Sequence, residues 1–311
     1  MVSYIFGPVP SRRLGRSLGV DLVPFKTCSY DCIYCQLART TCKTIERKEW
    51  VSLDAIISEL QSRLQSKPDY ITLSGSGEPT LYARTSELIA RIKEITQVPV
   101  AVLSNGSLFW RPEVRQSVSA ADVVIPSLDA GSEELFQKIN RPHSEITFAK
   151  MLQGLIELRQ EYRGQYWLEV FFLNGLNTAL PEIQRIAECV QRINPHRVQL
   201  NTVTRPPTED FALAVSPEKL QEIAEKIAPN AEIIADYRHI DTENQFTTTR
   251  EDIVNMLRRR PCSAQEIADV FGLHQNEVLK HLEKLTRSGK IVPERRAEKT
   301  YYKTPANREQ K

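Results

Sequence analysis

The sequence predicts an α/β protein with a parallel sheet, followed by a small domain of helices and a hairpin. Three observations predict this fold class. Short apolar segments alternate with amphipathic segments of helical period between residues 18 and 227, as expected of β–α units that build a parallel sheet. Polar residues and glycines directly follow most of the apolar segments. From about residue 250 the alternation stops, and helical segments come in succession.

Six strands are expected, one before a group of cysteines and five after it. They are residues 18–24 (LGVDLVP), Tyr70–Ser74, Val98–Ser104, Asp122–Ser127, Leu168–Leu173 and Val198–Thr202. The apolar residues of the other segments recur with helical spacing, which predicts helices. These are Val51–Leu64, Ser86–Ile95, Phe148–Tyr162, Ile183–Ile193 and about Pro217–Ile227.

The C-terminal segment has its own pattern. Glu251–Arg260 is expected as a helix that Pro261 ends, and Ser263 with Glu266 forms a capping box for the next helix. Gly272 breaks that helix, Gln275–Ser288 is a third, and residues 291–304 predict two short strands about a charged turn. This order resembles bacterial winged helix-turn-helix domains. The expected division is residues 1–236, a linker at 237–249, a winged helix at 250–305 and a polar tail at 306–311.

Composition and charge favour a cytoplasmic protein with a basic C-terminal segment. No apolar run is long enough to span a membrane, and the basic residues of the N-terminus follow its first apolar stretch, the wrong order for a secretory signal. The net charge is +2, but residues 250–311 contain 14 Lys/Arg and 9 Asp/Glu, a net +5. This asymmetry fits either a nucleic-acid partner or a solvated surface.

Three cysteines lie close together after the first strand. Cys28, Cys32 and Cys35 form a C-x3-C-x2-C run, CSYDCIYC. Three thiolates can hold three irons of a [4Fe–4S] cluster and leave the fourth iron open, whereas electron-transfer clusters usually have four cysteines. Zinc is the alternative, but a structural zinc site normally has a fourth ligand. The cluster requires a reducing compartment and favours an anaerobic setting.

This run, with Tyr34 before its last cysteine, resembles the radical S-adenosylmethionine (SAM) superfamily. The resemblance implies a partial (β/α)6 TIM-like barrel with its site at the C-terminal ends of the strands. It implies a [4Fe–4S] cluster whose open iron SAM chelates, reductive cleavage of SAM to a 5′-deoxyadenosyl radical, and a flavodoxin or ferredoxin as electron donor. It also places Tyr34 near the adenine.

Polar residues at the strand ends are the expected cofactor ligands. After the second strand, Ser76-Gly77-Glu78 resembles the family's GGE motif, which binds the SAM amino group, with a serine in place of the first glycine. The third and fourth strands are followed by further polar residues that are expected to contact SAM. These are Ser104, Asn105, Ser127 and Asp129. A turn at Asn105 and a helix cap at Asp129 are the structural alternatives.

Substrate ligands are expected from three other places. The N-terminal arginines Arg12, Arg13 and Arg16 fit either an anionic substrate or neutralisation of the cluster thiolates and surface acids. The other candidates are Arg141, Asn201 and Arg205.

Two classes of function remain open from the sequence. The first is an enzyme, and residues 1–230 resemble the subgroup containing the tRNA wyosine-base synthases, without the extra cysteines of their second cluster. The basic winged helix favours a nucleic-acid substrate, so RNA modification is the leading hypothesis. The alternative is radical modification or activation of a protein or peptide. A resemblance to glycyl-radical activases, through Glu78-Pro79 and Arg141-Pro142, is weaker. The second class is a cluster- or SAM-sensing DNA-binding regulator. The nucleic-acid candidates are Gln275, Lys280, Arg295 and Arg296.

Overall fold

The computed structural model describes residues 3–205, 207–235, 250–271, 273, 275–296 and 299–305. Its main element is an eight-stranded sheet with the spatial order β1-β2-β5-β6-β7-β8-β9-β10. Every neighbouring pair from β2 to β10 is parallel, while β1 is antiparallel to β2. The predicted α/β class with a parallel sheet is thus confirmed. The bounds are β1 Ile5–Ser11, β2 Gly15–Asp21, β5 Tyr70–Ser74, β6 Val100–Ser104, β7 Val123–Pro126, β8 Gln165–Phe172, β9 Arg197–Thr202 and β10 Ala231–Ile233.

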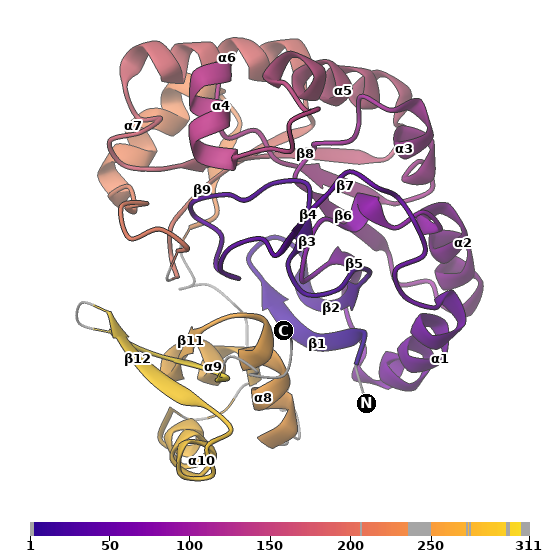
Figure 1. Cartoon of the computed structure of the whole chain (residues 1–311), viewed down its shortest axis with the longest axis vertical. Helices are drawn as coiled ribbons and strands as arrows, with labels where there is room; N and C mark the ends of the chain where they lie inside the picture. The colour runs from indigo at the N-terminus through magenta and orange to yellow at the C-terminus, as the bar shows by residue number, and fades with distance from the viewer. Residues whose placement is uncertain are drawn as a thin grey trace.

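The helices lie around the outside of this sheet (Figure 1). Their apolar faces, together with the strands, form one continuous core. The helices are α1 Leu53–Arg63, α2 Thr85–Ile95, α3 Pro112–Ser117, α4 Glu133–Asn140, α5 Phe148–Glu161, α6 Leu180–Ile193 and α7 Pro217–Ile227, with 3-10 turns η1 Leu64–Ser66 and η2 Pro79–Leu81.

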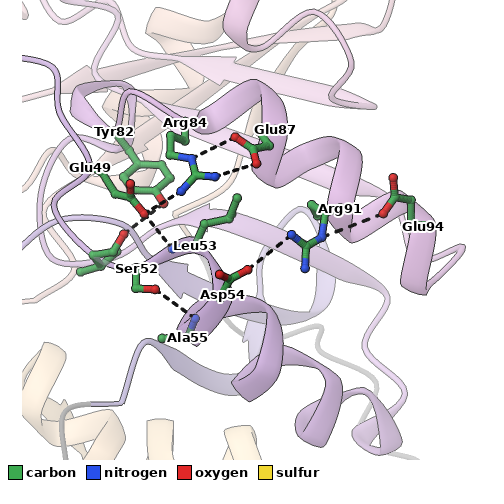
Figure 2. A network of polar contacts seen from close by, with 11 residues as sticks. Glu49, Ser52, Leu53, Asp54, Ala55, Tyr82, Arg84, Glu87, Arg91 and Glu94 are labelled. Carbon is green, nitrogen blue, oxygen red and sulfur yellow. Dashed lines mark hydrogen bonds and ion pairs between the residues drawn. The ribbon is translucent and has the colours of Figure 1, made fainter.

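Helix α1 shows how sequence and packing combine. The side chain of Ser52 accepts a bond from the backbone N–H of Ala55 (3.4 Å) and so caps the helix. Glu49 accepts from the N–H of Leu53 (3.2 Å) and pairs with Arg84 before α2 (2.9 Å), as Figure 2 shows. Exposed pairs of this kind contribute only about 0–1 kcal/mol each. The four buried side chains of α1 therefore contribute most of its stability: Leu53, Ile56, Ile57 and Leu60.

Several strands differ from expectation. Strand β2 begins at Gly15, three residues before the predicted strand, and β1 was not predicted because its sequence, IFGPVPS, contains two prolines. Proline is tolerated in an edge strand, where its missing N–H breaks no ladder. β1 occupies such an edge, and the small strand β10, also not predicted, lies at the opposite edge.

The described residues between 250 and 303, here called the C-terminal unit, form three helices and a three-stranded antiparallel sheet of order β11-β13-β12. The elements are α8 Arg250–Arg259, β11 Cys262–Ser263, α9 Ala264–Phe271, α10 Gln275–Arg287, β12 Val292–Arg296 and β13 Lys299–Lys303. The predicted capping box is present: Ser263 Oγ accepts from Glu266 N (3.2 Å), and Glu266 Oε2 accepts from Ser263 N (2.8 Å).

The C-terminal unit has its own buried core, and Val9 of β1 packs against it. Figure 1 shows α8 and α9 beside β1. The expected linker and polar tail fall outside the described residues. In the part of the chain that the structure describes, every helix is too short or too polar to cross a membrane.

Candidate functional site

The three cysteines lie in the loop that leaves β2 at the C-terminal edge of the sheet. A small parallel pair, β3 Thr27–Cys28 with β4 Cys42–Lys43, closes this loop on itself. The side chains of Cys28, Cys32 and Cys35 are half-buried, whereas Cys42 is exposed. Within the described residues, no three His, Cys, Asp or Glu side chains are placed to hold a single metal ion. A four-iron cluster differs from a single-ion site in that each cysteine binds a different iron.

Each of the three sulfurs accepts an N–H bond. Burial raises the pKa of Cys28 to about 12 and the pKa of Cys32 above its ordinary value, so neither thiolate forms readily without a cationic partner. Three donors aimed at the sulfurs fit thiolates that ligate iron. The bonds are Asn105 Nδ2 to Cys28 Sγ (3.5 Å), Asn140 Nδ2 to Cys32 Sγ (3.5 Å) and Lys26 Nζ to Cys35 Sγ (3.1 Å).

The loop after β5 packs directly on the cysteine loop. Ser76 O accepts from Lys26 N (2.7 Å), and Glu78 N donates to Thr27 O (3.1 Å). At Gly77, a Cβ would lie 1.9 Å from Thr27 O, so this approach requires glycine. The predicted cofactor residues Ser76, Gly77 and Glu78 are therefore beside the cysteines.

Glu78 is held in one orientation. Its Oε1 accepts from Thr80 Oγ1 (2.6 Å), Thr80 N (3.0 Å) and Ser104 Oγ (2.8 Å), and its Oε2 accepts from Asn105 N (2.8 Å). Burial raises the pKa of Glu78, and these bonds oppose the increase by favouring the carboxylate. Oε2 has capacity for a second donor, such as an ammonium group.

Asp129 and Tyr34 meet on the other side of the cysteine loop. Tyr34 stacks on Phe171 with the ring centroids 4.0 Å apart, and its hydroxyl donates to Asp129 Oδ2 (2.5 Å). Asn140 donates to the same oxygen (2.6 Å) and thereby connects Asp129 to Cys32. Burial raises the pKa of Asp129 to about 6, so it is mostly ionised at neutral pH.

The alternative role for Asp129 as a helix cap is wrong, because Ser132 occupies the N-cap position of α4. The turn at Asn105 is real, since its Oδ1 accepts from Ser107 N (2.9 Å), but the same side chain also donates to Cys28. Asn105 therefore both forms the turn and contacts a cysteine of the site. Ser127 lines the cavity described next.

A cavity of about 440 Å³ adjoins Tyr34 and Cys35. Arg13 pairs in it with Glu169 of β8, and Asn201 of β9 donates to the same carboxylate (2.9 Å). Burial acts to raise the pKa of Glu169, but Arg13 and Asn201 outweigh burial and hold the pKa below its ordinary value. The cavity is therefore lined by a fixed carboxylate and several guanidinium groups.

Only some of the other predicted arginines line the cavity. Arg12 donates to Asn201 Oδ1 (2.8 Å) and Thr204 Oγ1 (2.7 Å), and it lines the cavity, as does Arg205. Arg16 instead bonds the carbonyl of Ser66 and does not line the cavity. Arg141, the C-cap of α4 in the left-handed conformation, pairs with Glu209 (2.6 Å) and does not line the cavity.

The C-terminal candidates lie apart from the cavity. Gln275 and Lys280 are exposed on α10, and Arg295 is exposed on β12. The side chain of Arg296 falls outside the described residues.

Sequence reasoning missed four residues that contact the site: Lys26, Asn140, Glu169 and Asp21. Glu169 lies within a predicted strand, where an isolated charged residue between apolar neighbours was the one available indication. Asp21 and Asn140 become partners only through contacts across the fold, whereas Lys26 lies in the cysteine loop itself, nine positions before Cys35.

A parallel α/β sheet with three cysteines and the Ser76–Glu78 loop at its C-terminal edge is the arrangement expected of a radical SAM enzyme. The family model of the radical SAM superfamily matches residues 22–179, just over half of the chain. The chain therefore belongs to the radical SAM superfamily, whose members use a [4Fe–4S] cluster and SAM. A second model, described as PF0610-like, N-terminal, matches residues 248–291.

Its relatives include the UPF0026 proteins. The UPF0026 protein MJ1312 of Methanocaldococcus jannaschii is 33% identical over 306 residues, which cover 94% of this chain and 92% of that protein. The protein named GTPase Obg of Brachyspira hyodysenteriae is 43% identical over 295 residues, or 93% of this chain, but this chain spans only 43% of its length.

Solved structures share the fold. A radical SAM methyltransferase from Sphaerobacter thermophilus has a TM-score of 0.53 at 14% identity, covering 72% of this chain and 68% of that one. The hydrogenase maturase HydG from Carboxydothermus hydrogenoformans has a TM-score of 0.53 at 15% identity, covering 80% of this chain and 57% of that one. At these identities the likeness concerns the fold alone.

Proposed function

We propose that this radical SAM enzyme acts on RNA, with tRNA as the first candidate, and that the C-terminal unit is a winged helix that binds part of the substrate. Cys28, Cys32 and Cys35 would ligate the cluster, and Glu78 would accept the SAM amino group. When bound, the cluster and SAM supply one-electron cleavage of the sulfonium to a 5′-deoxyadenosyl radical. The electron donor would be a flavodoxin or ferredoxin.

The residues of the chain bind and orient in this proposal. Asn105 bonds both Cys28 and, through its backbone N–H, Glu78. One residue therefore fixes the spacing between a proposed cluster ligand and the proposed amino-group acceptor. Asn140 does the same for Cys32 and Asp129, which would accept a SAM hydroxyl. Such positioning is what the protein contributes to cofactor chemistry.

The charge of the C-terminal unit is the observation that carries the RNA proposal. Among the side chains that the structure describes between residues 275 and 299, six exposed ones are cationic and one exposed one, that of Glu283, is acidic. The six are Lys280, Lys284, Arg287, Lys290, Arg295 and Lys299. The arrangement of three helices and a terminal hairpin also supports a winged helix, with α10 as the element that enters a groove.

We expect the full chain to bind bulk tRNA with a steep salt dependence. Replacing Lys280 and Arg287 with glutamine should lower the slope of log K against log salt by about 1–2, because each phosphate contact releases about one counterion. Fluorescence anisotropy at several salt concentrations measures this slope. The Lys226→Gln variant, with an exposed lysine removed from α7, is the matched control and should leave the slope unchanged.

Other outcomes would redirect the proposal. If tRNA does not bind even at low salt, the hypothesis of a nucleic-acid substrate is excluded, and a protein or peptide substrate becomes the better hypothesis. Tighter binding of duplex DNA than of tRNA would favour the DNA-binding regulator.

A further inference from the structure

An ion pair connects the C-terminal unit to the loop that carries Glu78. Arg259, the last residue of α8, donates from Nε to Asp21 Oδ2 (3.0 Å) at the end of β2. The other oxygen of Asp21 accepts from Ser76 N (2.5 Å), two residues before Glu78. One carboxylate thus joins α8 to the backbone of the proposed SAM loop.

This contact is closely packed. The guanidinium of Arg259 lies 4.2 Å from the ring centroid of Phe6 on β1, and the two ionised side chains are only 14% and 11% exposed. At Gly75, a Cβ would be 1.8 Å from Asp21 Oδ1, so the loop approaches Asp21 as closely as glycine allows. Burial raises the pKa of Asp21, and Arg259 opposes that increase.

A second ion pair reaches the cysteine loop. Glu266 of α9 lies 3.3 Å from Arg205 Nε through its Oε1, and both side chains are largely buried. Arg205 Nη1 also donates to the side chain of Gln36 (3.2 Å), the residue after Cys35. The C-terminal unit is therefore connected to both loops that would hold the cofactors.

The same unit also lines the cavity. Met256, Arg259 and Arg260 contribute to its surface together with Cys35 and Gly77. Movement of α8 away from β1 would open the cavity and break the bond from Arg259 to Asp21. Docking of the unit and the shape of the SAM loop are thus determined by the same contacts.

We propose that docking of the C-terminal unit on the sheet is thermodynamically linked to SAM binding, with Arg259 as the positioning residue that acts through Asp21 on the Ser76–Glu78 loop. This inference rests on the proposed function of that loop. Linkage is reciprocal: if docking strengthens SAM binding, SAM strengthens docking by the same factor. Whatever macromolecule occupies the C-terminal unit would then control the affinity for SAM.

The test compares SAM affinity in the cluster-reconstituted full chain by anaerobic equilibrium dialysis. Arg259→Gln should raise the Kd about 5- to 20-fold, within the range of known site-to-site couplings. Asp21→Asn should raise it similarly, and the double variant should add little, because both changes break one connection. Arg258→Gln is the matched control, because Arg258 is the neighbouring residue on the same helix and its side chain is exposed. This variant should leave the Kd unchanged.

Hydrogen exchange gives a readout that does not depend on turnover. SAM should slow exchange of the α8 amides in the wild-type chain and have little effect on them in Arg259→Gln. A purely structural role for Arg259 would lower the melting temperature without changing the response of α8 to SAM. Two milder variants serve if Arg259→Gln does not fold. Arg259→Lys keeps the charge, and Glu266→Gln weakens the second connection. Both should still show weaker SAM binding and a smaller response of α8 to SAM.

The inference and the proposed function fail differently. If the wild-type chain binds no SAM, the proposed function itself is wrong. A wild-type chain that binds SAM, together with a folded Arg259→Gln variant of equal affinity and equal exchange protection, overturns the linkage alone.

Discussion

The Cys32→Ala variant is expected to lose its cluster and release no 5′-deoxyadenosine above background. Cys32 lies between the other two proposed ligands in the loop, and its sulfur accepts a bond from Asn140. Substitution of groups that only support a metal ligand typically costs 10- to 100-fold, so loss of a ligand should lower SAM cleavage by more than ~100-fold. Iron content, visible absorption of the reconstituted protein and 5′-deoxyadenosine by mass spectrometry measure the effect.

Cys42→Ala is the matched control. This cysteine lies in the same loop, but its side chain is exposed. Its removal should leave both iron content and SAM cleavage intact. Full iron content in Cys32→Ala, or equal losses in the two variants, would contradict the proposed ligand set.

The Glu78→Gln variant should have the second largest effect, on SAM affinity. The carboxylate is 1% exposed and bonded to Thr80, Ser104 and Asn105, so its position is fixed before SAM arrives. A hydrogen bond to a charged group contributes about 1.5–3 kcal/mol, which corresponds to a roughly 10- to 150-fold rise in Kd. The cluster should still assemble, because Glu78 is not a proposed ligand.

Equilibrium dialysis of SAM against the reconstituted variant measures this change. Glu87→Gln removes a carboxylate that pairs with Arg84 at the surface (Figure 2), and it should bind SAM as the wild type does. Unchanged affinity in a folded, iron-loaded Glu78→Gln variant would remove Glu78 from the proposed SAM contacts.

The sequence was sufficient for features that are local. The C-x3-C-x2-C run lies within eight residues, and Glu78 follows an apolar strand by four residues, so this spacing, together with the resemblance to the radical SAM family, placed both at one edge of the sheet. The capping box of Ser263 and Glu266 was predictable for the same reason, since both bonds join residues three apart.

Features that depend on distant contacts were not predictable. Asn140 reaches Cys32 across 108 positions, and Arg259 reaches Asp21 across 238. Neither residue stands in a motif, and an asparagine at the end of a helix is common at any surface. The three N-terminal arginines looked alike in the sequence, yet only Arg12 and Arg13 face the cavity, because the β1–β2 turn directs Arg16 toward the carbonyl of Ser66.

The most direct test is SAM cleavage by the wild-type chain under anaerobic conditions. The reconstituted protein is incubated with SAM, dithionite and bulk tRNA from a strain that lacks this gene, and the products are analysed by mass spectrometry. The expected result is 5′-deoxyadenosine that increases with tRNA, accompanied by a nucleoside of new mass. A protein that carries its cluster and binds SAM but releases no 5′-deoxyadenosine, with or without tRNA, would contradict the account.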